Sequence, residues 1–283
     1  MSQRILRVAI IQSRIAGGAI ENFKMVRDMA STASSPEIMA IYENWLGRTP
    51  ISMEKYVGFS REILDVSGAR VLVAGSAYID IGGSIVSKSA IIDKGGSIAV
   101  GGKIFPSAAT GERSRVLPGD PPAIFKTIYG YSIASVICVD AMYPEIVRIA
   151  SLAGSYIVFN PSIIPSNRSY LWRALGASRA SENTIFFIHV NATNTKYVDG
   201  RDVMGGSFIA DPQGRISFEV GSGEGVFEAL IDLGEVDRIR TRWRYLEDIR
   251  ASLQEIYKIM FERSREFSKK ASANGGLGAL GSI

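Results

Sequence analysis

The sequence has 283 residues, of which 46% are hydrophobic and 21% charged, and its formal net charge is +4. This length and apolar content suit one large or two small α/β domains with a packed core. No apolar run approaches the roughly 18 residues of a membrane-spanning helix, and no basic block interleaved with aromatic residues indicates a nucleic-acid surface. The apolar run at 8–11 is also too short for a signal-peptide core of about 7–15 residues, so we expect a cytoplasmic protein.

Short apolar runs alternate with amphipathic helical patterns near the N-terminus, which predicts an α/β core. Further along, Pro144 is expected to open a helix that Gly154 ends, and Asp-Pro-Gln-Gly at 211–214 predicts a hairpin turn. The expected strands cover 6–12, 37–42, 71–74, 84–92, 97–100, 123–127, 132–138, 156–159, 184–191, 206–210 and 226–231. The expected helices cover 19–31, about 56 to 67, 144–153, 170–183 and most of the chain after 233.

The C-terminal part is charged and helical, with an apolar stripe at spacings of three and four residues. This stripe, defined by Leu253, Ile256, Tyr257, Met260 and Phe261, packs on the protein's own core or docks on a partner subunit, and the sequence favours neither. Residues 274–283 are rich in glycine and predict a disordered tail. We expect a main domain over 1–250, followed by a helical extension and Gly-rich tail over 251–283.

Single copies of cysteine and histidine restrict the possible chemistry. His189 lies in the apolar run 184–190, where a histidine is more often a buried core residue than a catalyst. A metal site built on two histidines of one chain is excluded. Hydrolytic chemistry would therefore depend on Cys, Lys, Glu, Asp, Ser or Tyr side chains.

Cys138 ends an apolar strand pattern six residues before the helix that Pro144 opens. A nucleophile on such a strand-to-helix turn is held rigidly at a sheet edge, where neighbouring backbone N–H groups can bind an oxyanion. A lone cysteine is, however, commonly a small buried apolar residue.

Glu43 and Lys103 also follow apolar segments or turns. Glu43 ends the run 38–43, and burial there would raise its pKa towards the range of a general base. Lys103 follows two glycines, where its ammonium could enter a pocket and stabilise an oxyanion or a thiolate. Taken singly, a glutamate in the position of Glu43 is more commonly a solvated loop acid, and Lys103 has the alternative of an exposed loop lysine.

Together, these three residues resemble the Glu–Lys–Cys triad of the carbon–nitrogen hydrolase, or nitrilase, superfamily. The resemblance covers the chain from about Leu6 to Arg250. Segments similar to the family's local motifs are 41–45 around the glutamate, 103–106, 111–112 and 118–120 around the lysine, 136–145 around the cysteine, and 172–183, 206–214 and 223–233. Tyr42, Gly102 and Val139 depart from the residues that the family usually has beside the triad.

The resemblance implies a four-layer αββα sandwich that assembles into dimers or larger homo-oligomers. It implies that Cys138 is the nucleophile, that Glu43 acts first as base and then as acid, and that Lys103 and the Val139 N–H bind the oxyanion. Glu112 matches a second glutamate that orients the site and holds the lysine. No metal or organic cofactor is implied.

The sequence Cys-Val-Asp-Ala-Met-Tyr-Pro-Glu at 138–145 is more similar to the amide-cleaving branches than to the nitrilases. We therefore expect an amidase of small aliphatic or ω-amides. Residues placed in its substrate pocket by motif position are Val139, Tyr143, Ser162, Ile163 and Trp172. The alternatives are an N-carbamoyl amidase, a nitrilase and, from another class, a non-catalytic scaffold on the same fold. Acyl transfer and glutamine amidohydrolysis for a synthetase are disfavoured, because neither membrane spans nor a synthetase are encoded in this sequence.

Overall fold

The computed structural model describes residues 4–127 and 129–273, and two β-sheets lie at the centre of its first compact unit, which runs to Trp243. The strands of the first sheet are β1 (Ile5–Gln12), β2 (Ile38–Ala40), β3 (Val71–Val73), β4 (Ala77–Ile81), β5 (Ser84–Asp93), β6 (Ile98–Gly102) and β15 (Gly225–Asp232). Those of the second are β7 (Ala123–Lys126), β8 (Ser132–Ser135), β9 (Ser155–Ser162), β10 (Phe186–Asn191), β13 (Phe208–Ala210) and β14 (Ile216–Glu219). A small separate ribbon pairs β11 (Thr195–Lys196) with β12 (Asp202–Val203).

The strand order is β15-β1-β2-β3-β5-β4 in the first sheet, with β6 beside β5, and β14-β13-β10-β9-β8-β7 in the second. In each sheet three neighbouring strands run parallel, β1, β2 and β3 in one and β8, β9 and β10 in the other. Loops that leave the carboxyl ends of parallel strands meet at one edge of a sheet, where α/β proteins commonly bind ligands. Glu43 follows β2 and Cys138 follows β8, so the topology places both at such edges.

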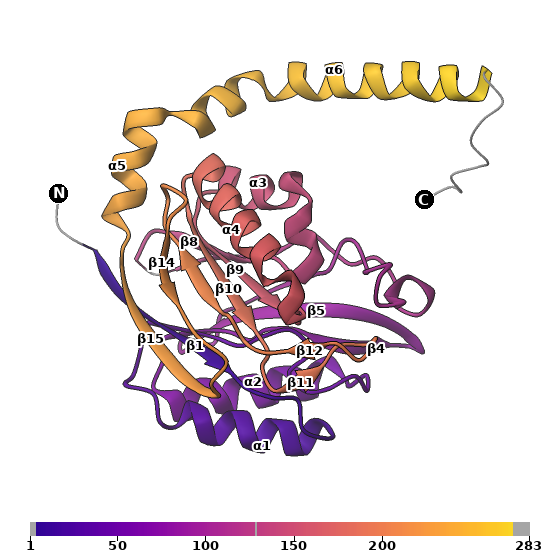
Figure 1. The fold of residues 1–283 in the computed structure, drawn as a ribbon. Helices are drawn as coiled ribbons and strands as arrows, with labels where there is room; N and C mark the ends of the chain where they lie inside the picture. The colour runs from indigo at the N-terminus through magenta and orange to yellow at the C-terminus, as the bar shows by residue number, and fades with distance from the viewer. Residues whose placement is uncertain (1–3, 128, 274–283) are drawn as a thin grey trace. The chain divides into compact units, whose positions relative to one another are not determined.

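Two pairs of helices cover the outer faces of the sheets (Figure 1). The first pair is α1 (Ala19–Ala30) and α2 (Met53–Ser67), and the second is α3 (Pro144–Leu152) and α4 (Ser169–Asn183). Local signals set their ends: Pro144 occupies the first turn of α3, and Gly68 ends α2 in the left-handed conformation with φ 68°. The predicted αββα sandwich is confirmed.

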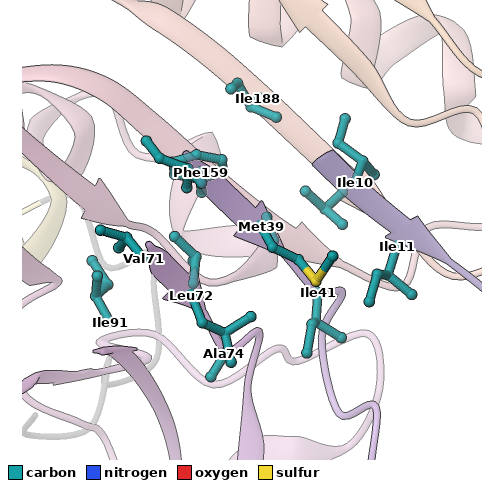
Figure 2. Close-up of a cluster of buried hydrophobic side chains, with 14 of the residues drawn as sticks. Ile10, Ile11, Met39, Ile41, Val71, Leu72, Ala74, Ile91, Phe159 and Ile188 are labelled. Carbon is teal, nitrogen blue, oxygen red and sulfur yellow. The ribbon is translucent and has the colours of Figure 1, made fainter. Parts of the chain in front are cut away.

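Apolar side chains fill the space between the two sheets (Figure 2). Ile10, Met39 and Leu72 of the first sheet and Phe159 and Ile188 of the second are fully buried. Central strands such as β2 and β10 are buried along their whole length because helices cover the other face of each sheet. This explains why the strands appear in the sequence as continuous apolar runs without polar alternation.

The structure corrects several predicted elements. β4 and β14 were not predicted, and both carry alternating or half-exposed patterns with weak apolar signals. The strand expected over 132–138 ends at Ser135. Cys138 has a φ of 47°, outside the β region, and begins the short 3₁₀ turn η2 (Cys138–Met142).

The C-terminal helices are α5 (Gly234–Trp243), which belongs to the first compact unit, and α6 (Tyr245–Ala273), which forms the second. Arg244 has a φ of 55°, which interrupts the helical path between them. The second compact unit begins at Arg244. The division into a main domain over 1–250 and an extension over 251–283 stays a prediction.

Within α6, the apolar stripe has Leu253 and Ile256 partly covered and Tyr257, Met260 and Phe261 exposed. The predicted disordered tail, 274–283, lies outside the described residues. In the part of the chain that the structure describes, no helix combines the length and apolar character needed to span a bilayer.

Candidate active site

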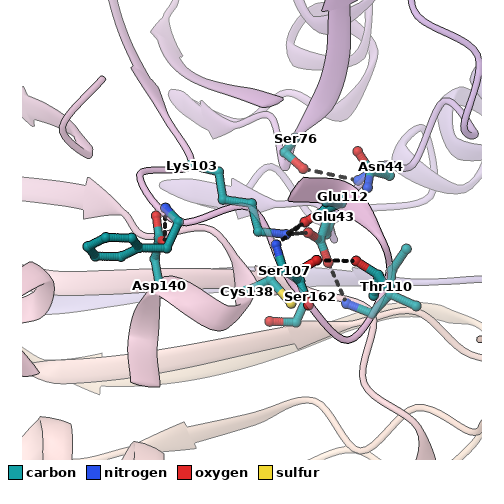
Figure 3. A network of polar contacts seen from close by, with 12 residues as sticks. Glu43, Asn44, Ser76, Lys103, Ser107, Thr110, Glu112, Cys138, Asp140 and Ser162 are labelled. Atoms are coloured by element: carbon teal, nitrogen blue, oxygen red, sulfur yellow. Dashed lines mark hydrogen bonds and ion pairs between the residues drawn. The ribbon is translucent and has the colours of Figure 1, made fainter. Parts of the chain in front are cut away.

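Side chains from both sheets meet in one buried polar network (Figure 3). Glu43 comes from the turn after β2, Lys103 from the residue after β6, and Cys138 from the turn after β8. Glu112 opens the 3₁₀ turn η1 (Glu112–Ser114) in the loop beyond Lys103. All four predicted catalytic side chains therefore lie together, although 60 residues separate Glu43 from Lys103 in the chain.

Lys103 lies between two carboxylates. Its Nζ is 2.8 Å from Oε1 of Glu43 and 2.7 Å from Oε2 of Glu112, and the three side chains are only 2%, 5% and 3% exposed. Burial opposes the ammonium, but the negative charges of Glu43 and Glu112, joined by that of Cys138 whenever its thiol is ionised, outweigh it and raise the pKa of Lys103 well above its ordinary value. The Lys103 ammonium thus keeps its positive charge within the site.

The two carboxylates have different surroundings. Burial raises the pKa of Glu43, whose Oε2 accepts one backbone hydrogen bond from Ile163, at 3.0 Å. Burial also acts on Glu112, but Lys103 and hydrogen bonds from the Tyr78 hydroxyl (2.7 Å) and the Ser107 N–H (2.7 Å) outweigh it and lower its pKa. Carboxylates whose pKa values are pushed apart in this way take separate roles. Glu43 is suited to exchange a proton, and Glu112 is suited to remain an anion that holds Lys103.

Cys138 is held in a strained turn at the base of the site. Its φ of 47° is unusual for a residue with a side chain, and Asn160 fixes the turn by donating to the carbonyl oxygens of Val136 (2.8 Å) and Cys138 (3.0 Å). Burial, followed by the charge of Glu43, raises the pKa of the Cys138 thiol well above its usual value. The resting thiol is therefore protonated, and its hydrogen bond to Glu43 marks the path by which the proton can leave.

Asp140 joins the cysteine turn to the lysine loop. Its carboxylate accepts hydrogen bonds from the backbone N–H groups of Ile104 (2.7 Å) and Phe105 (3.0 Å), directly after Lys103. Burial raises the pKa of Asp140 to about 6. No role was expected for Asp140 from the sequence. The available signal was its place two residues after Cys138, but its partners became visible only in three dimensions.

His189 is a buried core residue. Its Nδ1 lies 3.1 Å from Oδ1 of Asn160, and burial lowers its pKa to about 3, so the imidazole is neutral. The same Asn160 oxygen accepts from the indole N–H of Trp172 (3.3 Å) and from the Ser162 hydroxyl (3.0 Å). These residues hold the Asn160 side chain, whose amide N–H group bonds to the cysteine turn.

A cavity of about 460 Å³ opens above the network. The predicted site residues that line it are Glu43, Lys103, Glu112, Cys138, Val139, Tyr143, Ile163 and Trp172. Ser162 was also predicted for the substrate pocket, but it is fully buried outside the cavity lining and bonds to Asn160.

Other residues that line the cavity were not expected from the sequence. They include Arg48, Tyr78, Arg115, Arg168, Tyr197 and Arg201. Tyr78 lies on β4, a strand that was not predicted, and the arginines lie on separate loops without a local pattern that distinguishes them from solvated ones.

A metal site is not apparent in the described parts of the chain, 4–127 and 129–273, where no group of three or more His, Cys, Asp or Glu side chains could hold an ion.

A family model described as "Carbon-nitrogen hydrolase" matches residues 70–241, which include Lys103, Glu112 and Cys138. The chain belongs to the carbon-nitrogen hydrolase family. Glu43 lies before the matched residues, and its place in the site rests on its contact with Lys103.

Several curated relatives carry amidase names. The 2-oxoglutaramate amidase of Bacillus subtilis is 33% identical over 124 residues, covering 44% of this chain and 47% of that protein. The (R)-stereoselective amidase of a Pseudomonas species is 33% identical over 146 residues, which cover 50% of this chain and 51% of that protein. The omega-amidase of Saccharomyces cerevisiae is 26% identical over 130 residues, which cover 46% of this chain and 44% of that protein. The chain thus matches about half the length of each of these relatives.

Solved structures of the carbon-nitrogen hydrolase family share the fold over most of the chain. A CN-hydrolase superfamily protein of Xanthomonas campestris aligns with a TM-score of 0.76 at 20% identity, over 88% of this chain and 97% of that one. An amidase of a Nesterenkonia species aligns with a TM-score of 0.73 at 22% identity, over 89% and 96%. At these identities the likeness concerns the fold.

Proposed function

We propose that this protein hydrolyses the carbon–nitrogen bond of a small non-peptide amide, giving a carboxylic acid and ammonia through a thioester on Cys138. One observation carries the proposal. The Lys103 ammonium lies between Glu43 and Glu112 at the base of a cavity that Cys138 also lines. A nucleophile, a base with a raised pKa and a fixed cation are the groups that acyl transfer requires.

In the first half-reaction, Glu43 accepts the thiol proton while Sγ of Cys138 attacks the amide carbon. The negative charge that develops on the carbonyl oxygen is stabilised by the Lys103 ammonium and by the N–H of Val139, which has no acceptor among the described residues. The carbon–nitrogen bond then breaks, and Glu43 donates its proton to the departing nitrogen. Ammonia leaves and a thioester remains.

In the second half-reaction, Glu43 removes a proton from a water molecule that attacks the thioester carbon. The carbon–sulfur bond breaks, the acid leaves, and the Cys138 thiolate recovers the proton from Glu43. The raised pKa of Glu43 suits both proton transfers, because burial makes its carboxylate a stronger base while its protonated carboxyl group remains an acid. Glu112 stays ionised throughout and keeps Lys103 in place.

The names of the relatives support an amide as the substrate over a nitrile or an N-carbamoyl amine. The cytoplasmic location and the homo-oligomeric state expected from the sequence remain proposals. Cell fractionation tests the first. Light scattering tests the second, and a monomeric mass would contradict it.

The decisive experiment measures ammonia release from a panel of small amides, nitriles and N-carbamoyl amines by the parent protein and by Cys138→Ala. We expect amide hydrolysis that the substitution reduces by at least about 10⁴-fold. Ser178→Ala, which removes an exposed hydroxyl on α4, serves as a control and should keep the parent rate. Undiminished release by Cys138→Ala would reject the thioester mechanism, and no release across the panel would favour the non-catalytic scaffold.

A further inference from the structure

One buried polar side chain that lines the cavity has no hydrogen-bond partner among the described residues. Asn44 follows Glu43 in the chain, lines the same cavity and is only 4% exposed. Its backbone N–H donates to the Ser76 hydroxyl at 3.1 Å (Figure 3), and its backbone carbonyl oxygen accepts from the N–H of Gly47 at 2.8 Å. Neither the oxygen nor the nitrogen of its side chain bonds to a residue in the described part of the chain. The backbone of Asn44 is therefore anchored, whereas its carboxamide is not.

Such an unbonded group is an exception in a folded protein. Nearly all buried polar groups form hydrogen bonds, so each exception needs an explanation. In the residues that the structure describes, the buried side-chain atoms without a partner are Oδ1 of Asn44, Oγ of Ser87, Oγ of Ser155 and Oδ1 of Asn183. Of these four residues, Asn44 alone lines the cavity.

The backbone conformation explains the residue type at position 44 but not the burial of the carboxamide. Asn44 has a φ of 48°, and asparagine and glycine tolerate this left-handed region better than most residues. Asn194 has a φ of 47°, yet it is exposed and its Nδ2 donates to Oε1 of Glu224 at 2.9 Å. A left-handed asparagine can thus find a partner within this protein, and the unbonded carboxamide of Asn44 indicates a partner that binds in the cavity.

The proposed reaction places a geometric demand on the nitrogen of the substrate. Glu43 protonates this nitrogen as the carbon–nitrogen bond breaks, so the nitrogen lone pair must face the Glu43 carboxyl group at about 3 Å. The N–H groups then point away from Glu43 and need acceptors, because an unbonded polar group in a buried site is unfavourable. The carboxylates that line the cavity, Glu43 and Glu112, already bind Lys103. The side-chain oxygen of Asn44, beside Glu43, accepts from no described residue.

We propose that Asn44 is a specificity-determining residue whose side-chain oxygen accepts a hydrogen bond from an N–H of the substrate amide and holds the leaving nitrogen beside Glu43. This inference rests on the proposed function and adds to it the recognition of the leaving group. Because the carboxamide is bonded at neither end, it can turn about its last side-chain bond and bring its oxygen to the cavity. A nitrile and an ester have no N–H at the corresponding position, so Asn44 favours amides over both.

The test compares an amide and an ester that form the same thioester on Cys138. Butanamide carries N–H groups on its leaving nitrogen, whereas the leaving oxygen of methyl butanoate carries none. Asn44→Gly removes the carboxamide at a backbone conformation that glycine adopts freely. We expect it to lower kcat/KM for butanamide about tenfold or more and to change the value for methyl butanoate by less than about threefold.

Two further variants distinguish a contact with the substrate from a general disturbance of the site. Asn44→Asp keeps an oxygen in the same place, so the amide-to-ester ratio of kcat/KM should stay within about threefold of the parent's. Asn194→Gly makes the same substitution at nearly the same φ, outside the cavity lining, and should alter neither substrate. A ratio that falls as far in Asn44→Asp as in Asn44→Gly would overturn the assignment to the side-chain oxygen.

An equal fall for both substrates in Asn44→Gly, or no fall for either, would overturn the inference, while Cys138-dependent ammonia release left the proposed function standing. Should butanamide not be hydrolysed, an NMR titration of butanamide into the parent tests the contact without turnover. Asn44→Gly should then weaken binding about tenfold, and equal affinities would overturn the inference. Weakened binding in a protein that releases no ammonia from any amide would support the contact and reject the hydrolase mechanism.

Discussion

Glu43 and Glu112 bind the same ammonium group, that of Lys103, yet their pKa values move in opposite directions. The cause lies in the other contacts of each carboxylate. Glu112 also receives hydrogen bonds from Tyr78 and Ser107, and these favour its charged form. Glu43 is left with burial as its dominant influence, and the charge of Glu112 raises its pKa further. One buried cation therefore contacts both a carboxylate that stays ionised and a carboxylate whose raised pKa suits the proton exchange we propose.

The pH dependence of kcat/KM should report this arrangement. In the proposed mechanism Glu43 must be a carboxylate to accept the thiol proton, so we expect activity to fall as the pH drops through its raised pKa. In Glu112→Gln the neighbouring negative charge is removed, and we expect the acidic limb to move to lower pH while kcat falls because Lys103 loses a partner. Pre-steady-state or steady-state rates from pH 4 to 8 check this. Glu54→Gln, an exposed acid in the first turn of α2, should leave the limb in place. A limb that moves to higher pH in Glu112→Gln would contradict the interpretation.

Asp140 should make the protein less stable as the pH rises. Its pKa is raised from 3.8 to about 6 in the folded protein, so between these values the folded state holds the proton more tightly than the unfolded state. The stabilisation that protonated Asp140 provides is complete below its pKa in the unfolded state. It is lost as the pH rises through its pKa in the folded state. Relative to Asp140→Asn, the parent should lose about 2–3 kcal/mol of unfolding free energy between pH 4 and pH 6.

Urea denaturation of both proteins across that range measures the Asp140 effect. Asp65→Asn changes an exposed acid on α2 and should follow the parent. A difference between parent and Asp140→Asn that does not vary with pH would show that Asp140 titrates normally.

The backbone at Cys138 predicts a stability difference between two inactive variants. Because its φ is 47°, Cys138→Gly should be more stable than Cys138→Ala by up to about 1 kcal/mol, although both lose the proposed nucleophile. The same comparison at Ala141, in the same turn but without a positive φ, should have the opposite sign, with Ala141→Gly less stable than the parent. Thermal denaturation checks both. Equal stabilities of the two Cys138 variants would mean that the turn relaxes without cost.

His189 should be dispensable for the chemistry. It is neutral and buried, and it bonds to Asn160 behind the cysteine turn. We expect His189→Gln to lower the free energy of unfolding by about 1–3 kcal/mol through imperfect packing and hydrogen bonding, and to leave the pH profile of kcat/KM unchanged. A profile that loses one of its limbs in this variant would assign His189 a proton-transfer role.

The sequence by itself determined the α/β character, most strands and helices, and the identity of the catalytic candidates. Strands such as β2 and β8 are fully or largely buried runs, and the residues that follow them are Glu43 and, after a short turn, Cys138. These are properties of short segments, in which burial pattern and backbone preference are encoded locally. The ends of the strands were less well predicted. The strand expected to reach Cys138 stops at Ser135, because a positive φ at one residue leaves no trace in an apolar pattern.

Only the tertiary structure decided which groups meet. The partners of Glu43 lie 60 residues away at Lys103 and 120 residues away at Ile163, and Asp140 reaches back 36 residues to Ile104. The opposite pKa shifts of Glu43 and Glu112 and the set of residues that line the cavity have the same origin. They depend on the register and stacking of two sheets, which bring distant loops to one edge. A sequence encodes such neighbours through the packing of the whole core, and no local pattern of residues carries that information.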